Sequence, residues 1–294
     1  MGRCPPLAVV VLLVLAGGPL PAGGTGPASD RAGVRLEPAA PVQGDTLVVL
    51  VPAPPSARVI VSFDGAPIPV FPVGPRLRRA LVGTDPDTAP GAHRVGVQVD
   101  SRTGAFQISL PAHVAPGRFR VRHVTLPPRT FGLITPHNVA LERRILTPLL
   151  ERLTPTAWWR GPFRLPSAGP VDSPYGDQSV YNGHREWWHQ GVDIEAPEGA
   201  PVTASNAGVV VLARRLPLGG TTVVVDHGQG VVTEYLHLSQ VTVREGQRVG
   251  RGSLIGRIGH TGLVTGPSLH WGLFVRGIPV NPLFWTAVHA GLTD

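Results

Sequence analysis

Residues 209–237 read VVVLARRLPLGGTTVVVDHGQGVVTEYLH. The stretch contains three valine-rich runs separated by glycine-containing turns: residues 209–213, 221–226 and 231–237. Valine is frequent in strands because its branched side chain fits the pleated surface, whereas glycine permits tight turns. The pattern therefore predicts an antiparallel β-meander. Similar runs at residues 253–258 and 269–276 extend it, and no helix of normal length is predicted from residue 166 to residue 294.

A second strand-rich region lies closer to the N-terminus. Its apolar runs are residues 46–51, 57–63, 93–99 and 105–110. Turn signals such as Asp64-Gly65 separate them, and short strands at this spacing are typical of a β-sandwich. We therefore predict an all-β chain, with an N-terminal β-sandwich domain at residues 33–120 and a β-rich C-terminal domain at residues 166–294.

Residues 121–165 are predicted to connect the two domains. Within them, residues 138–153 are predicted to form a helix, because apolar residues at helical spacing share one face. Asn138 is the expected N-cap, and Pro148 inside the pattern predicts a kink or a division of the helix. The pair Trp158-Trp159 follows. Large aromatic side chains are usually buried, so we expect this pair to dock the connector on its neighbour rather than to bind sugar.

The N-terminus predicts export. An arginine, the apolar run Leu7–Ala16 and the small residues that follow are typical of a secretory signal peptide at residues 1–24. The apolar run is shorter than the ~20 residues that span a bilayer, so the mature chain is expected to have no integral membrane segment. An uncleaved N-terminal anchor is the alternative. The expected location is secreted, periplasmic or in the cell envelope.

The composition narrows the possible partners and chemistry. The only cysteine is Cys4, inside the predicted leader, so thiol-protease chemistry and cysteine zinc sites are excluded from the mature chain. All 26 basic residues are arginine, against 19 acidic residues. This balance favours anionic partners such as wall polymers, although codon bias explains the missing lysine equally well. The arginines are scattered without aromatic stacking motifs, so a nucleic-acid partner is not expected. The oligomeric state is not predicted.

Three short segments of the C-terminal region carry candidate metal ligands: HQGVD at 189–193, YLH at 235–237 and GPSLH at 266–270. A zinc ion that serves hydrolysis takes three histidine or carboxylate ligands and keeps one position open. His189, Asp193 and His270 could be these ligands, which leaves His237 to handle protons. On a strand, residues four apart point to the same face. The competing interpretation is that these are ordinary hydrogen-bonded histidines on strands.

A longer series of motifs resembles the LytM/lysostaphin-type zinc endopeptidases, the secreted peptidoglycan hydrolases of bacteria. The motifs are Ser173-Pro-Tyr-Gly176, Asn182-Gly183, His189-x-Gly-x-Asp193, Ala196-Pro-x-Gly-x-Pro201, Asp226-His-Gly228, Tyr235-x-His237, Gly256-x-x-Gly259 and Thr265-Gly-Pro-x-Leu-His270. They occur in the order of the family and cover nearly the whole C-terminal domain. The N-terminal region also resembles the sandwich that often precedes this catalytic domain.

The resemblance implies one Zn²⁺ per chain, held by His189, Asp193 and His270. It implies that His237 is not a ligand but contacts the water or the developing oxyanion. The implied function is a secreted zinc metalloendopeptidase that hydrolyses peptide bonds of peptidoglycan by zinc-activated water. Other nearby polar residues, His184, Glu186 and His260, are candidates to line the groove, and His227 in its Asp-His-Gly turn is expected to be structural.

One position departs from the family pattern. The family usually ends in His-x-His, and its first histidine is a second catalytic side chain; here Ser268 stands in that place. Serine offers a hydrogen bond but no charge and no useful basicity at neutral pH. Two alternatives therefore stay open: a catalytically weak or inactive module that binds or regulates the wall, and an exported carbohydrate-binding sandwich without stoichiometric metal.

Overall fold

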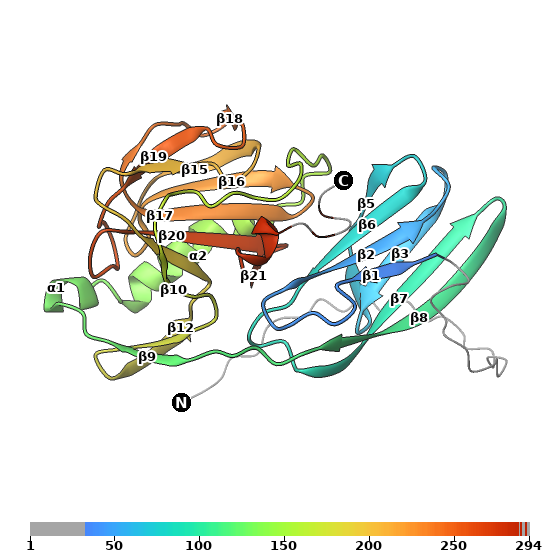
Figure 1. Ribbon diagram of the computed structural model, residues 1–294, viewed down its shortest axis with the longest axis horizontal. Helices are drawn as coiled ribbons and strands as arrows, with labels where there is room; N and C mark the ends of the chain where they lie inside the picture. The colour runs from blue at the N-terminus through green and yellow to red at the C-terminus, as the bar shows by residue number, and fades with distance from the viewer. Residues whose placement is uncertain (1–32, 288, 290–291, 293–294) are drawn as a thin grey trace.

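The protein forms two β-rich lobes (Figure 1). The structure is a computed structural model that describes residues 33–287, 289 and 292, except for the side chains of residues 185–187. The predicted signal peptide at residues 1–24 lies outside the described residues. Strands account for 49% of the chain and helices for 9%, so the predicted all-β class is confirmed. None of the helices in the described part has the length and apolar composition needed to cross a bilayer.

The N-terminal lobe is the predicted β-sandwich. One antiparallel sheet has the order β1 (Arg35–Glu37), β2 (Thr46–Pro52), β6 (Leu77–Gly83), β5 (Val70–Gly74). The other has the order β4 (Ala66–Ile68), β3 (Arg58–Phe63), β7 (Gly91–Ser101), β8 (Gly104–Val114). Alternating side chains of the two sheets meet in an apolar core, in which Val49 and Val82 from the first sheet join Val97 from the second.

Strand β2 is buried on both faces. Leu47 and Val49 point into the sandwich core, whereas Val48 and Leu50 join the apolar core of the C-terminal lobe. A strand with two covered faces has an unbroken apolar sequence rather than an alternating one, which accounts for the run at residues 46–51. The C-terminal lobe therefore covers the outer face of this sheet.

Strand β6 was not predicted, because Arg78 and Arg79 interrupt its apolar pattern. Arg79 is nevertheless 3% exposed. Its guanidinium lies 4.4 Å from the ring centre of Trp159, and its Nη2 donates a hydrogen bond to Oε1 of Gln229 at 2.5 Å. Trp159 is itself buried and packs edge-on against Trp285. The expected docking role of the tryptophan pair is therefore confirmed for Trp159.

The C-terminal lobe is built on one large antiparallel sheet. Its strands follow the order β10 (Val171–Ser173), β13 (Gly191–Glu195), β20 (Ser268–Val275), β17 (Val231–Val241), β16 (Gly220–Gly228), β15 (Gly208–Leu216), β18 (Arg248–Val249). Strand β19 (Leu254–Ile258) pairs with β17 and with β14 (Pro201–Thr203), and β21 (Ile278–Val280) pairs with β20. The short 3₁₀ helix η1 (Phe284–Thr286) follows. The predicted meander is strands β15, β16 and β17.

The connecting region contains more structure than predicted. Its strand β9 (Val121–Val124) pairs in parallel with β11 (Gln178–Tyr181), which in turn pairs with β12 (His184–Trp188). A one-turn helix α1 (Pro128–Phe131) follows β9. Because β9 joins a sheet of the C-terminal lobe, the connector runs along that lobe (Figure 1). The boundaries of the connector at residues 120 and 165 stay a prediction.

Helix α2 (Pro136–Leu150) differs from the predicted helix at both ends. Its N-cap is Thr135, whose hydroxyl accepts a hydrogen bond from the backbone N–H of Asn138 at 3.1 Å. The expectation that Asn138 is the N-cap is therefore wrong, because a threonine three residues earlier satisfies the free N–H groups. The helix includes Pro148 without dividing, and its apolar face packs on the outer face of the β15–β17 meander.

Candidate metal centre

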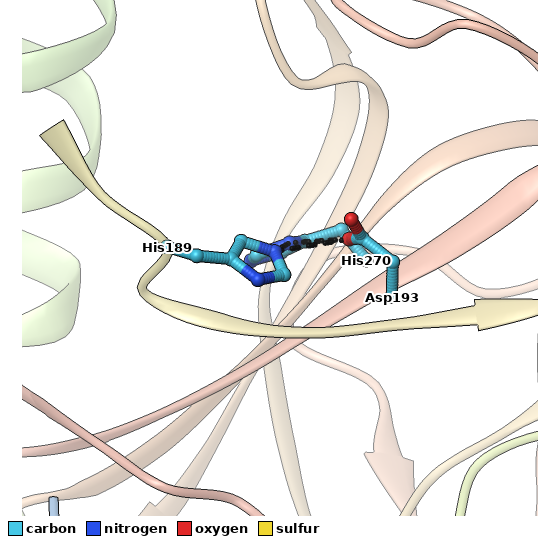
Figure 2. Close-up of side chains that lie close together, drawn as sticks. All are labelled: His189, Asp193 and His270. Atoms are coloured by element: carbon cyan, nitrogen blue, oxygen red, sulfur yellow. Dashed lines mark hydrogen bonds and ion pairs between the residues drawn. The ribbon is translucent and has the colours of Figure 1, made fainter. Parts of the chain in front are cut away.

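His189 lies directly after strand β12 and is fixed at both backbone and ring. Its backbone N–H donates to the carbonyl of Asp177 at 2.8 Å. Its ring Nδ1 lies 2.9 Å from the carbonyl oxygen of Pro174. A carbonyl only accepts hydrogen bonds, so Nδ1 carries the hydrogen and the lone pair of the neutral ring is at Nε2. That nitrogen points toward Asp193 (Figure 2).

Asp193 and His270 are placed by the pairing of two strands. They are direct register partners on β13 and β20, so their side chains project from the same face of the sheet. Asp193 Oδ1 lies 3.0 Å from His270 Nδ1 and 3.1 Å from His189 Nε2, and the two nitrogens are 3.0 Å apart. The structure thus brings together the three predicted ligands (Figure 2).

Gly191, between the first two ligands, makes room for the third. A Cβ atom at this position would lie 2.7 Å from Nε2 of His270 and 2.4 Å from the carbonyl oxygen of Trp271. Both separations are shorter than normal contacts, so any side chain would displace strand β20. The glycine of the His-x-Gly-x-Asp motif is therefore a packing requirement of the cluster.

The three ligand atoms fit a zinc ion. In a tetrahedral site with bonds of ~2.0–2.1 Å, two ligand atoms are about 3.3 Å apart, and the observed separations of 3.0–3.1 Å differ from that by a few tenths of an ångström. Two imidazole nitrogens and a carboxylate oxygen are also the donor types of hydrolytic zinc sites. Across the described residues, no other group of three His, Cys, Asp or Glu side chains converges in this way.

Carboxylates surround His270 on both sides of its ring. Nδ1 faces Asp193, and Nε2 lies 3.6 Å from Oε1 of the buried Glu234. Burial lowers the pKa of His270, but the two carboxylates outweigh it and raise the pKa to about 9. Burial would raise the pKa of Asp193, whereas His189 and His270 hold it well below its usual range. The cluster therefore favours a positive charge at its centre, whether a proton or a metal ion.

His237 lies beside the cluster on strand β17 but is not part of it. Its ring centre is 6.3 Å from that of His270, and its Nδ1 lies 2.8 Å from the carbonyl oxygen of Thr261. The hydrogen is therefore on Nδ1 and the lone pair on Nε2. Burial, followed by repulsion from His270, lowers the pKa of His237 to about 4. The ring is neutral at physiological pH and can accept a proton.

The backbone of His237 is held in an uncommon conformation. Its φ angle is +66°, in the left-handed region, and its N–H donates to the carbonyl of Gly219 at 2.9 Å. Non-glycine residues adopt this region only when their surroundings enforce it, and such residues are frequent at functional sites. The loop that contains Gly219 thus helps to set the position of His237.

Ser268 lies where the resemblance placed it, whereas two other candidates do not reach the site. Ser268 is half-buried on β20, two residues before His270, and lines the same pocket. His260 is exposed and pairs instead with Glu198, with 3.1 Å between Nδ1 and Oε2. The exposed His184 packs against Phe131. The expectations that His260 and His184 line the groove are therefore wrong.

The remaining candidates near the motifs are accounted for separately. The side chain of Glu186 lies outside what the structure describes. His227 is completely buried, with Nδ1 2.8 Å from the carbonyl oxygen of Ala207 and Nε2 2.8 Å from Oγ1 of Thr233. Both ring nitrogens are satisfied far from the cluster, so the structural role expected for His227 is confirmed.

A pocket of about 650 Å³ opens over the candidate site. Besides His189, Asp193, His237 and His270, it is lined by acidic residues that the sequence did not single out, among them Glu142 and Glu234. Glu142 on α2 is buried, and its carboxylate accepts hydrogen bonds from the backbone N–H groups of Leu218 and Gly219. The sequence offers one signal for Glu142. It is an acidic residue that lies one helical turn before Leu146, on the apolar side of the predicted helix.

The family comparison agrees with this geometry. Residues 188–282 match the model of peptidase family M23. They form an M23 peptidase domain. This segment contains His189, Asp193, His237, Ser268 and His270.

Two curated proteins are similar to this part of the chain. Peptidoglycan DD-endopeptidase ShyA of Vibrio cholerae is 52% identical over 95 residues, which is 32% of this chain and 22% of that protein. The DD-carboxypeptidase/endopeptidase Mpg of Neisseria meningitidis is 41% identical over 113 residues, which is 38% of this chain and 26% of that protein. The matches therefore span about a quarter of these relatives or less.

A solved structure resembles both lobes together. It is described as a peptidase M23 from Pseudomonas aeruginosa, with a TM-score of 0.53 and 27% sequence identity. The alignment covers 81% of this chain and 95% of that structure. The similarity therefore extends beyond the M23 segment.

Proposed function

We propose that this protein is a zinc metalloendopeptidase that acts outside the cytoplasm and hydrolyses peptide bonds of peptidoglycan. The observation that carries the proposal is the convergence of His189, Asp193 and His270 within 3.1 Å of one another, beside His237, inside an M23 domain. The names of the relatives from Vibrio and Neisseria support peptidoglycan as the substrate class. An extracytoplasmic location follows from that substrate.

His189, Asp193 and His270 would hold the metal, each oriented by its own surroundings. The carbonyl of Pro174 fixes the tautomer of His189, and Glu234 lies against the far nitrogen of His270. Such outer partners orient metal ligands and increase their basicity. A zinc ion at this position would supply a Lewis acid that polarises the peptide carbonyl and lowers the pKa of water.

His237 has the properties of a proton carrier for this reaction. It is neutral, because its pKa is lowered to about 4, and the hydrogen bond to Thr261 leaves Nε2 as its acceptor. Peptide hydrolysis requires a proton to leave the attacking water and another to reach the departing amine. His237 can accept a proton at Nε2 and return it, and its hydrogen-bonded ring can also stabilise charge that develops on the carbonyl oxygen.

We expect Ser268 to lower the rate of hydrolysis relative to a site with histidine at this position. It lines the pocket and can donate one hydrogen bond, but it cannot carry a positive charge as a histidine can. The loss of one oxyanion-type donor typically lowers a rate by about 10²–10³. The three ligands and His237 retain the larger electrostatic contributions, so the proposal is a slowed enzyme.

A second candidate function is favoured by the same serine. In that account the chain is a wall-binding or regulatory module whose pocket no longer supports turnover.

Incubation of zinc-loaded protein with isolated cell walls distinguishes the enzyme from the binding module. Release of new amino termini by the wild type, with none by Asp193→Ala, supports the enzyme. His260→Ala changes an exposed histidine away from the pocket and should cleave like the wild type. Binding to walls without release would support the module.

A further inference from the structure

One wall of the pocket comes from outside the M23 segment. Helix α2 contributes residues at positions i, i+3, i+4, i+7 and i+11 of one helical face: Val139, Glu142, Arg143, Leu146 and Leu150. Along this face the side chains are apolar except for one acid and one base. The connecting helix is therefore part of the substrate pocket rather than a spacer.

The buried acid on this face fixes the helix in place. The carboxylate of Glu142 accepts hydrogen bonds from the N–H groups of Leu218 and Gly219, the latter at 3.0 Å. Hydrogen bonds to a buried carboxylate are stronger than neutral ones and specify a single geometry. Arg143, the next residue, consequently projects from a fixed backbone.

Arg143 differs from the other arginine of the pocket. Arg122 on β9 is hydrogen-bonded to Oγ of Ser173, and its Nη2 lies 3.8 Å from a carboxylate oxygen of Asp172. Arg143 is exposed, and among the described residues its side chain forms no hydrogen bond or ion pair. Its guanidinium is thus available to a ligand that enters the pocket.

The other charges of the pocket restrict where an anionic ligand can lie. Glu142 on the helix side is buried, and its carboxylate is already bound by the N–H groups of Leu218 and Gly219. The other acidic side chains that line the pocket lie on strands β10, β13 and β17 of the C-terminal lobe: Asp172, Asp193, Glu195 and Glu234. They repel a carboxylate, whereas the planar guanidinium of arginine binds one through two parallel hydrogen bonds. A negatively charged group in the pocket is therefore favoured on the helix side, next to Arg143.

We propose that Arg143 is a specificity-determining residue that binds a free carboxylate of the peptide substrate close to the cleaved bond. The inference rests on the proposed peptidase function and adds a substrate requirement to it. A peptide that ends near the cleaved bond, or that has an acidic side chain there, presents such a carboxylate. The connecting helix would thus select negatively charged peptides for the metal centre.

The test compares a synthetic cross-linked wall peptide with versions in which one carboxylate at a time is converted to a carboxamide. Amidation of the carboxylate that Arg143 binds should lower the wild-type kcat/KM by about 10- to 100-fold, mainly through an increase in KM, as expected for loss of a hydrogen-bonded charge. Amidation of the other carboxylates should have a smaller effect. Arg143→Ala should lower kcat/KM for the free carboxylate by a similar factor and abolish the preference. Arg143→Lys, which keeps the charge, should restore part of it.

Arg144 provides the matched control. It is the adjacent exposed arginine on α2 but does not line the pocket in the described structure, so Arg144→Ala should retain the full preference. Equal preference in the wild type and Arg143→Ala, or no preference in the wild type, would overturn the inference. Thermal unfolding of each variant verifies that the fold is intact.

Binding separates a failure of this inference from a failure of the proposed function. Calorimetric titration of the same peptides into zinc-loaded His237→Ala, with and without Arg143→Ala, measures recognition without relying on turnover. If the wild type cleaves no peptide, the enzyme proposal fails, but tighter binding of the carboxylate peptide that depends on Arg143 still supports the inference. Cleavage of all peptides with equal binding would retain the enzyme and reject the role of Arg143.

Discussion

The Nε2 atom of His189 lies 3.0 Å from the Nδ1 atom of His270, although 81 positions separate the two residues in the chain. The hydrogen bond from His189 Nδ1 to Pro174 leaves a lone pair at Nε2, so the nitrogen faces its neighbour as an acceptor. A lone pair on Nδ1 of His270 would repel this acceptor at such a distance unless a cation or a proton lies between the two nitrogens. The pairing of β13 with β20 nevertheless holds His270 beside Asp193. The fold therefore imposes a geometry that favours a bound cation.

Replacement of Ser268 by histidine should increase turnover. Ser268 lines the pocket two residues before His270, and a histidine there would add a donor that can carry charge. We expect Ser268→His to increase the rate of cell-wall cleavage about tenfold or more, with unchanged zinc content. The rate of release of amino termini measures this effect.

Three outcomes of that substitution are distinguishable. Faster cleavage supports a slowed enzyme, and an inert variant supports a binding module. Slower cleavage would mean that the serine belongs to a working variant of the site. His260 does not supply the missing interaction in the structure, because it is paired with Glu198 on the surface. His260→Ala should consequently leave the rate unchanged in both the wild type and Ser268→His.

Removal of the Glu142 carboxylate should reduce both stability and turnover. Glu142→Ala leaves the N–H groups of Leu218 and Gly219 without their acceptor, which costs about 1–3 kcal/mol for a buried donor. The carbonyl of Gly219 also accepts the N–H of His237, so a shifted loop should lower kcat more than it changes zinc affinity.

Urea unfolding and steady-state kinetics measure these two effects for Glu142. Glu142→Gln keeps one acceptor oxygen and should recover part of both losses. Equal stability and equal kcat in the wild type and Glu142→Ala would contradict the proposed anchoring.

The stability of the protein should depend on pH through His227. Burial lowers the pKa of His227 to about 4, against an ordinary value of 6.5. Between these two pH values the unfolded chain binds a proton that the folded chain does not. Acidification from pH 6.5 towards pH 4 should therefore reduce the free energy of unfolding, by at most roughly 3 kcal/mol from this residue.

Denaturant unfolding at pH 7 and pH 5 tests that dependence. His227→Gln can still donate to the carbonyl of Ala207 but has no titratable group, so it should lose less stability between the two pH values than the wild type. An identical loss in the two proteins would contradict the assignment of the pH dependence to His227.

The parts of the fold with a strong local pattern were predictable from the sequence. Strands β15, β16 and β17 have valine-rich runs separated by glycine turns, and local patterns of this kind determine strand pairing through short connections. Strand β6 was missed because Arg79 is buried only through contacts with Trp159 and Gln229, which are distant in sequence. Strand β9 was missed because its partner β11 lies more than fifty residues away.

The candidate site was predictable in part, for a related reason. The spacing of His189 and Asp193 and the resemblance of the surrounding motifs identified the three residues that the fold brings together. Glu142 was not identifiable as a pocket residue, because its role depends on the docking of α2 against the loop at Leu218. Glu234 likewise gains its relation to His270 only through the pairing of β17 with β20.

The most direct test of the account is the zinc content of purified protein after dialysis against metal-free buffer. We expect one zinc ion per chain in the wild type and severe loss of zinc in His189→Ala, Asp193→Ala and His270→Ala, whereas His237→Ala and His260→Ala should retain it. Each of the three ligands is needed, because a site of this type has only three from the protein. Zinc retained as tightly by His270→Ala as by the wild type, or no zinc in the wild type, would contradict the central claim.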